Sequence, residues 1–222
     1  MNEYYLLLIR SCPLLLKGTL MTLQVLFYSA IISFALGLCF GIFSCNRLRI
    51  PGLSFFIETI TFVLRAVPFV VQLLIVYFVL PDMFGISIEA FPASILALGM
   101  CSSGYLAQII RAGINSIPAS QWEAANSLGY SVFQSLLHII FPQVWRNILP
   151  ACSNEVDSLL KSTAIISSIG MLELTRMGMN IVSREMQPVP IYLIVAFFYL
   201  CMSAIFNFVT RGLERRLAYV KY

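Results

Sequence analysis

Three long apolar stretches without a charged side chain constrain this chain more than any other feature. They cover residues 18–46, 90–110 and 186–210. Each is longer than the roughly 20 residues that an apolar helix needs to cross a bilayer. With 59% hydrophobic and 11% charged residues and a mean hydropathy of +0.88, the chain is too apolar for a soluble globule. We therefore predict a membrane-spanning helix in each stretch.

Two further spans are expected at about residues 53–80 and 148–172. Both are interrupted by charged side chains, which are Glu58 and Arg65 in the first and Glu155, Asp157 and Lys161 in the second. Backbone groups in lipid must be hydrogen bonded within the protein, so spans of this kind are helices. The predicted fold class is an all-α membrane protein with about five transmembrane helices, forming a single domain over residues 1–222.

Several classes of function are disfavoured by what the chain lacks. It contains no G-x-x-x-x-G-K-[ST] phosphate loop, and no Ser/His/Asp, Cys/His or metal-spaced cluster. The six cysteines form no C-x-x-C pair and are expected to be small buried apolar residues. His138, the single histidine, is interpreted as a packed polar side chain. We therefore expect no catalytic residues, no metal and no cofactor bound by this chain. We also expect no nucleic-acid partner, because the basic residues are dispersed at span ends.

The charges of the loops predict an orientation in the membrane. Short loops rich in Lys and Arg stay in the cytoplasm. The turn after the first span carries Arg47 and Arg49, and the C-terminal segment is also basic, whereas the loop at 81–89 is acidic. The N-terminus and the 81–89 loop are therefore expected outside, and the C-terminus in the cytoplasm.

Two expectations concern the first span and the residues before it. The apolar run Tyr4–Ile9, followed by Arg10 and Pro13, is too short to cross and is expected to lie at the membrane surface. Within the span, Gly37 and Gly41 form a small-xxx-small pair where another helix could approach closely.

The stretch at 116–150 is polar without being a terminus, which is typical of a connector outside the bilayer. Ser116 or Ser120 could cap a first helix, and Gly129 is expected to end it. A second helix is then expected to run toward Pro142. The sequence predicts a short helix, a turn and a second helix between two spans.

This connector resembles the EAA loop in the permease subunits of bacterial ABC importers, E-A-A-x3-G-x9-I-x-L-P. In this chain the pattern begins with Glu123-Ala124-Ala125, and Gly129 follows after three intervening residues. Ile139 comes after nine more residues, and one further residue separates it from Phe141-Pro142. Phe141 replaces the usual leucine. The flanking stretches that resemble the polar amino-acid branch of the family are Leu16–Leu20, Arg65–Gln72, Asn154-Glu155 and Leu159–Thr163.

The resemblance implies the type I ABC importer permease fold, with a cytoplasmic coupling loop at about 116–150, in a bacterial inner membrane. It implies three partners. The first is a cytoplasmic dimer of ABC ATPase subunits, which uses ATP and Mg. The others are a second permease subunit, either identical or a sister, and an extracytoplasmic amino-acid-binding protein. ATP-driven closure of the ATPase would switch the spans between outward and inward openings. The residues expected to dock the ATPase are Ala119, Trp122, Glu123, Ala124, Ala125, Leu128 and Gly129. The alternative is a helix that floats on the membrane, with Trp122 and Trp145 as interfacial aromatics.

Charged side chains at membrane depth allow two interpretations, because a charge at the bilayer centre costs about 2.5–3.5 kcal/mol even on a lenient scale. The first is a structural network that pairs Asp157 with Lys161 and Arg65 with Glu155. The second is a site for a zwitterion, in which Arg65 receives a carboxylate and Glu155 or Asp157 receives an ammonium group. Gln72, seven residues after Arg65, is placed on the same helical face and completes this candidate substrate site.

The expected function is the membrane-spanning subunit of an ATP-driven importer of polar amino acids. Asp157 departs from the pattern of the branch, and an extra acid favours a cationic substrate such as arginine, lysine or histidine. Import of glutamine or another neutral or acidic amino acid is the alternative. An ion-coupled secondary transporter and a non-transporting membrane subunit are the rival classes.

Overall fold

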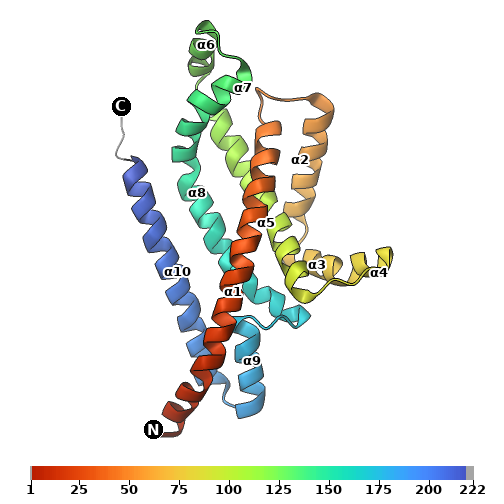
Figure 1. Cartoon of the computed structure of the whole chain (residues 1–222), viewed down its shortest axis with the longest axis vertical. Coiled ribbons are helices and arrows are strands. Elements are labelled where there is room, and N and C mark those ends of the chain that lie inside the picture. Colours follow the sequence, from red (N-terminus) through yellow and green to blue (C-terminus); the bar gives the residue numbers. More distant parts are fainter. Residues whose placement is uncertain (1, 219–222) are drawn as a thin grey trace. The chain divides into compact units, whose positions relative to one another are not determined.

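A computed structural model describes residues 2–218, and every regular element in this part of the chain is a helix (Figure 1). In order, these are α1 (Asn2–Phe43), α2 (Pro51–Ala66), α3 (Phe69–Leu74), the π-helical η1 (Ile75–Val79), α4 (Leu80–Phe84), α5 (Ala90–Asn115), α6 (Ala119–Ser127), α7 (Val132–Ser135), the π-helical η2 (Leu136–Ile140), α8 (Phe141–Ser162), the 3₁₀-helical η3 (Thr163–Ile169), α9 (Leu174–Glu185) and α10 (Pro188–Ala218). The predicted all-α fold class is confirmed.

Three of these helices are long and apolar enough to cross a membrane: Ile9–Phe43 within α1, all of α5, and Pro188–Arg216 within α10. They coincide with the three uncharged stretches of the sequence. The segments Pro51–Ala66 and Phe69–Phe84 are long and apolar enough to cross only when they are taken together as one broken span. The fifth expected span, at about 148–172, covers the second half of α8 and all of η3, and it is not among the segments that are long and apolar enough to cross.

The break in the second span is complete. Val67 and Pro68 have extended backbones, with ψ of 130° and 138°. A residue before proline is disfavoured in the helical region, and proline has no N–H to continue the ladder. The structure therefore has two separate helices, α2 and α3.

The first helix is longer than expected. α1 runs without interruption from Asn2 to Phe43 and includes Pro13. The run Tyr4–Ile9 therefore continues directly into the first span, and its place at the membrane surface stays a prediction.

The chain packs as two compact units, each built from three separated segments. Unit 1 comprises Met1–Ala30, Pro68–Gly99 and Asp157–Asn207, and unit 2 comprises Ile31–Val67, Met100–Val156 and Phe208–Tyr222. The long helices α1, α5, α8 and α10 each contribute residues to both units. The expectation of one domain over residues 1–222 stays a prediction.

In unit 1, one face of α9 packs on the beginnings of α1 and α10. The side chains that form this core are Leu15, Leu174, Ile181, Ile191 and Val195. Thr22 Oγ1 accepts a hydrogen bond from the Leu174 amide at 3.2 Å. A Cβ added at Gly178 would lie 2.6 Å from Val195 Cγ2, so α9 and α10 approach closely at this glycine.

In unit 2, the end of α1 packs closely on α5. A Cβ at Gly37 would lie 2.7 Å from Leu106 Cβ, and one at Gly41 would lie 2.7 Å from Ile110 Cβ. This confirms the predicted small-xxx-small contact. The core continues through the connector into α8, and its buried members are Cys45, Leu106, Ile110, Ile114, Ile117, Trp122, Leu136, Ile140, Val144, Ile148 and Cys152.

Candidate functional site

The connector between α5 and α8 is a helix, a glycine turn and a second helix, as expected. After α6, the Gly129 amide bonds to the Asn126 carbonyl at 2.9 Å, and the Tyr130 amide bonds to the Ala125 carbonyl at 3.1 Å. This pair of bonds is the Schellman motif, which places a left-handed residue after the helix. Gly129 has a φ of +83°, and a Cβ added at this position would have nothing within 4 Å. The requirement for glycine is therefore conformational and not steric.

The capping residues differ from those expected. The N-cap of α6 is Pro118, without a side-chain hydrogen bond, and Ser116 Oγ donates to the Gly113 carbonyl instead. Ser131 caps α7, where it and Gln134 form a reciprocal capping box. The second helix also does not stop at Pro142, because η2 leads directly into α8. The helix that leaves the connector is therefore continuous with the span.

Two of the residues expected to dock a partner face inward. Trp122 is 7% exposed and Ala125 is 1% exposed, and the Trp122 ring lies in the same core as Leu136 and Ile140. The expectation that Trp122 anchors the connector in a partner's groove was wrong. Its burial instead fixes α6 to unit 2, so α6 does not float as an isolated surface helix.

The opposite face of α6 is open. The expected docking residues on it, all exposed, are Ala119, Glu123, Ala124, Leu128 and Gly129. Leu128 is 75% exposed, and Phe133 on α7 is 58% exposed. Small side chains allow another backbone to come close, and large exposed apolar ones mark interaction surfaces. Unit 2 thus presents a rigidly mounted helix with a free outer face.

A basic residue from another part of unit 2 contacts a tryptophan of this connector. Arg47, from the turn between α1 and α2, places its Cζ 5.9 Å from the centre of the Trp122 ring. Arg47, Trp122, Asn126 and Tyr130 are among the residues that line a cavity of about 310 Å³ beside α6. From the sequence, Arg47 indicates only the orientation in the membrane, because no local pattern links it to a tryptophan so far along the chain.

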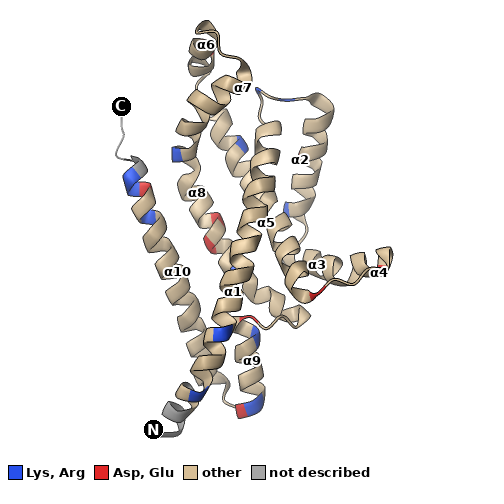
Figure 2. Cartoon of the chain, viewed as in Figure 1, with Lys and Arg blue, Asp and Glu red and all other residues tan. Residues whose placement is uncertain are grey.

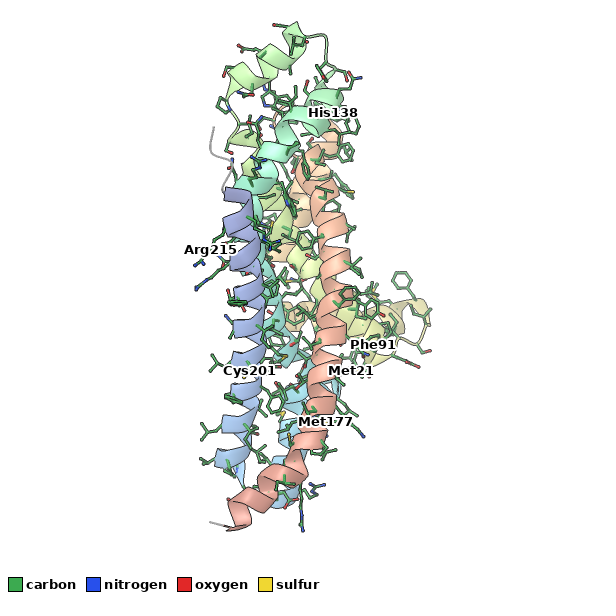
Figure 3. All side chains as sticks on the ribbon, turned by 60° about the vertical axis from the view of Figure 1, so that its left-hand side comes forward. Met21, Phe91, His138, Met177, Cys201 and Arg215 are labelled. Carbon is green, nitrogen blue, oxygen red and sulfur yellow. The ribbon has the colours of Figure 1, made fainter. Side chains whose placement is uncertain are left out.

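His138 lies on η2 (Figure 3). It is exposed, its Nδ1 is 3.0 Å from the Gln134 carbonyl, and its ring is 6.3 Å from that of Tyr130. Within residues 2–218, no group of three His, Cys, Asp or Glu residues could hold a metal ion. His138 is a polar surface residue that bonds to its own helical turn.

Among the charged residues of the spans, Glu58 is the most extensively paired. Its carboxylate lies 3.6 Å from Arg49 and 3.5 Å from Arg111, and Arg111 also donates to Gln108 at 2.6 Å. These contacts join the α1–α2 turn, α2 and α5 in unit 2. From the sequence, Glu58 is recognisable only as a charged residue that interrupts the second expected span.

Arg65 and Glu155 do not pair in the described chain. Arg65 Nε donates to the Thr61 carbonyl at 3.1 Å, and the Arg65 side chain lies against Gly104 of α5. Glu155 Oε1 accepts from Ser102 Oγ of α5 at 2.7 Å. Because residues two apart on a helix point in nearly opposite directions, α5 separates Arg65 from Glu155. Figure 2 shows the charges of α2 and α8 with α5 between these helices.

Asp157 forms the expected pair with Lys161. Its Oδ2 is 2.7 Å from the Lys161 ammonium, and its Oδ1 accepts from Ser203 Oγ of α10 at 2.6 Å. The Asp157 side chain is 15% exposed, against 67% for Lys161. Both carboxylate oxygens are therefore engaged, and the charge that Asp157 brings is matched by Lys161.

Gln72 is not positioned as the sequence suggested. It is buried in α3, and Arg65 belongs to α2. Because the chain is extended at Val67 and Pro68, a seven-residue spacing no longer places the two side chains on one helical face. The predicted common face of Arg65 and Gln72 was wrong.

A buried acid in unit 1 was missed by the sequence analysis. Glu173 is fully buried and caps α9 by accepting from the amides of Thr175 at 2.8 Å and Arg176 at 2.7 Å. Tyr199 of α10 donates to the same carboxylate at 3.0 Å. The signal in the sequence is an acid directly before a short amphipathic helix, where a carboxylate can bond to free amides.

Comparisons with known proteins agree with this architecture. Residues 33–219 match the family described as binding-protein-dependent transport system inner membrane component. The chain is 33% identical to the arginine transport system permease protein ArtQ of Bacillus subtilis (strain 168), over 98% of both chains. It is 32% identical to the glutamine transport system permease protein GlnP of Escherichia coli (strain K12), over 93% of this chain and 94% of the relative.

Two solved structures extend the comparison. A crystal structure of an amino acid ABC transporter with histidines superimposes with a TM-score of 0.86 at 36% identity, over 94% of this chain and 96% of the other. The methionine ABC transporter MetNI, in an inward-facing conformation, gives a TM-score of 0.80 at 20% identity, over 92% and 96%. At that lower identity, the likeness concerns the fold alone.

Proposed function

The chain belongs to the family of binding-protein-dependent transport system inner membrane components, and from this premise we propose that it moves a polar amino acid across the membrane by ATP-driven alternating access. It is a permease subunit of the amino-acid ABC importer type. The proposal concerns its substrate, its partners and the way in which they drive it.

The ATPase is proposed to bind the outer face of α6. This face presents Ala119, Glu123, Ala124 and Leu128 to solvent, while Trp122 holds the same helix to the core of unit 2. A helix that is exposed on one side and fixed on the other can pass a displacement to the spans on either side of it. This arrangement is the single observation that carries the proposal.

The motor is proposed to be a separate dimer of cytoplasmic ABC ATPase subunits. The chain has no phosphate-binding loop of the G-x-x-x-x-G-K-[ST] type, so ATP and Mg would be used by that partner. A second permease subunit, identical or a sister, and an extracytoplasmic amino-acid-binding protein complete the proposed assembly. In this arrangement the connector and the C-terminus face the cytoplasm, and the N-terminus faces outside.

Glu155 is proposed to receive the ammonium group of the substrate. Its one hydrogen bond within the described chain is from Ser102, which leaves the second carboxylate oxygen available. Arg65 is proposed to meet a carboxylate. Since α5 lies between Arg65 and Glu155, the two would act at successive positions along the path or in two permease copies, and not on one ligand within one chain.

The choice of amino acid rests on two observations that point in different directions. Pairing of Asp157 with Lys161 removes the extra negative charge that favoured a cationic substrate, and so favours glutamine. The solved structure at 36% identity is of an amino acid transporter with histidines, which favours the cationic class. The relatives at 33% and 32% identity are an arginine and a glutamine permease and favour neither class. We retain both, with arginine, lysine or histidine as the first candidates and glutamine as the second.

The proposal is tested by purifying the chain from its own membrane and identifying the subunits that remain bound. We expect an ABC ATPase and a sister or identical permease. Proteoliposomes of this complex, supplied with the binding protein and ATP, should accumulate labelled arginine or glutamine. Accumulation without ATP, driven by an ion gradient, would contradict the proposal and indicate a secondary transporter.

A further inference from the structure

The turn between α1 and α2 is fixed on three sides within unit 2. Cys45 is fully buried in the core that also contains Trp122. The Asn46 amide donates to Asn115 Oδ1, at the end of α5, at 3.1 Å. Arg49 pairs with Glu58 of α2. Because these ties lead to different elements, the turn cannot shift without moving the ends of the helices that it joins.

The connector reaches α1 and α2 only through non-covalent contacts. α6 is joined by the chain itself to α5 on one side and, through α7 and η2, to α8 on the other. A displacement of α6 therefore passes to α5 and α8 directly. For α1 and α2, one route within unit 2 leads through α5, on which the end of α1 packs, and another leads through the Trp122 ring to the α1–α2 turn.

Arg47 lies at the centre of this route. Its guanidinium carbon is 5.9 Å from the centre of the Trp122 ring, within the range at which a cation is attracted to an indole face. Arg47 makes no ion pair among the residues that the structure describes, whereas Arg49 on the same turn does. The arginine is therefore available to hold the ring, and the ring belongs to the helix that we propose the ATPase moves.

We propose that Arg47 is a positioning residue for coupling, which holds Trp122 so that movement of α6 reaches the ends of α1 and α2. This inference rests on the proposed function, since it requires an ATPase on the outer face of α6. Arg47 contacts the buried Trp122 ring, and Glu123 of the docking face lines the same cavity as Arg47. Transmission and retention of the ATPase are therefore measured side by side.

The test uses the complete complex of permease, ATPase and binding protein in proteoliposomes. The variants are Arg47→Met, which keeps an unbranched side chain and removes the charge, and Arg47→Lys, which keeps a cation. Arg146→Met is the matched control, because Arg146 is exposed near the beginning of α8 and contacts no ring and no acid in the described chain. The readouts are the ratio of substrate-stimulated to basal ATP hydrolysis and the amount of ATPase retained by the purified permease.

We expect Arg47→Met to lower the stimulation ratio by about two- to five-fold, the range that a cation–π contact supports. Arg47→Lys should restore most of it, and retention of the ATPase should be unchanged in both. A stimulation ratio for Arg47→Met equal to that of Arg146→Met would overturn the inference. Should Arg47→Met not insert, Arg47→Gln takes its place in the same comparison.

A double-mutant cycle with Trp122→Leu, which removes the aromatic ring, separates this role from a general loss of structure. If Arg47 acts through the ring, combining Arg47→Met with Trp122→Leu should cost less than the product of the two single effects. Independent, multiplicative effects would overturn the inference. If the unmodified complex shows no substrate-stimulated hydrolysis, the proposed function fails instead, so the two failures are distinguishable.

Discussion

Ser102 of α5 donates a hydrogen bond to Glu155 of α8, with 2.7 Å between Oγ and Oε1. The two residues are 53 positions apart in the chain and belong to the same compact unit. The contact fixes one oxygen of the Glu155 carboxylate. It also directs Glu155 to the side of α5 away from Arg65.

Removal of this hydrogen bond should weaken substrate handling. In Ser102→Ala, Glu155 loses the donor that orients it, and hydrogen bonds to charged groups contribute about 1.5–3 kcal/mol. We expect the KM for uptake to rise about ten-fold or more with a smaller change in kcat, measured in proteoliposomes. Ser103→Ala is the control, since Ser103 is also buried but donates to the Met100 carbonyl of its own helix. Equal KM values for the two variants would remove the role proposed for Glu155.

The pair of Asp157 and Lys161 predicts how substrate preference responds to mutation. Because Lys161 already neutralises Asp157 at 2.7 Å, Asp157→Asn should change the uptake of arginine and of glutamine by similar factors. Competition between labelled arginine and unlabelled glutamine measures this directly. A loss confined to arginine would show that Asp157 selects a cationic side chain despite its partner.

The same pair should show coupling in stability. Asp157→Asn and Lys161→Met each leave one charge without its partner, and the double variant removes both. We expect the thermal midpoint in detergent to fall for each single variant and to recover in part for the double variant. The coupling energy for residues in contact is about 0.5–3 kcal/mol. Additive shifts would indicate that the ion pair is not maintained in the folded protein.

Gly129 should tolerate few replacements, for conformational reasons. A φ of +83° is unfavourable for an ordinary L-residue by about 1–2 kcal/mol, although a Cβ at this position would have nothing within 4 Å. Gly129→Val should therefore disturb the turn and lower substrate-stimulated ATP hydrolysis, whereas Gly129→Asn should be milder, since asparagine adopts this conformation more readily. Equal activity of the two variants would indicate that the turn does not need a left-handed residue.

Gly37 should be sensitive for a steric reason instead. In Gly37→Ala the new Cβ would meet Leu106 Cβ at 2.7 Å, and overpacking of this kind typically costs about 1–3 kcal/mol. The thermal midpoint of the purified protein should fall. Gly52→Ala provides the control, because a Cβ at that position has nothing within 4 Å. Similar midpoints for both variants would contradict the close packing of α1 on α5.

The sequence predicted the features that depend on local chemistry. Uncharged runs located the long helices, Gly129 marked the turn, and Gly37 with Gly41 marked a helix contact. The i,i+4 spacing of Asp157 and Lys161 predicted their ion pair. Each of these follows from the period of a helix or from the geometry of one residue type.

Features that depend on distant segments were not predictable in this way. Trp122 was expected to face a partner, but the direction of its ring is decided by a core that includes Leu136 and Ile140. Gln72 was placed beside Arg65 by counting along a helix that in fact ends at Ala66. The contact of Arg47 with Trp122 depends on the packing of two loops, for which one sequence contains no local signal.

The most direct measurement is the accessibility of a cysteine placed at Ser120, an exposed position at the beginning of α6. The variant is prepared in a background without the six native cysteines and treated with a membrane-impermeant maleimide. We predict no labelling in intact cells, labelling in inverted membrane vesicles, and protection when the ATPase is bound. Labelling from outside intact cells would place the connector on the wrong side of the membrane and contradict its role as the site on which the ATPase acts.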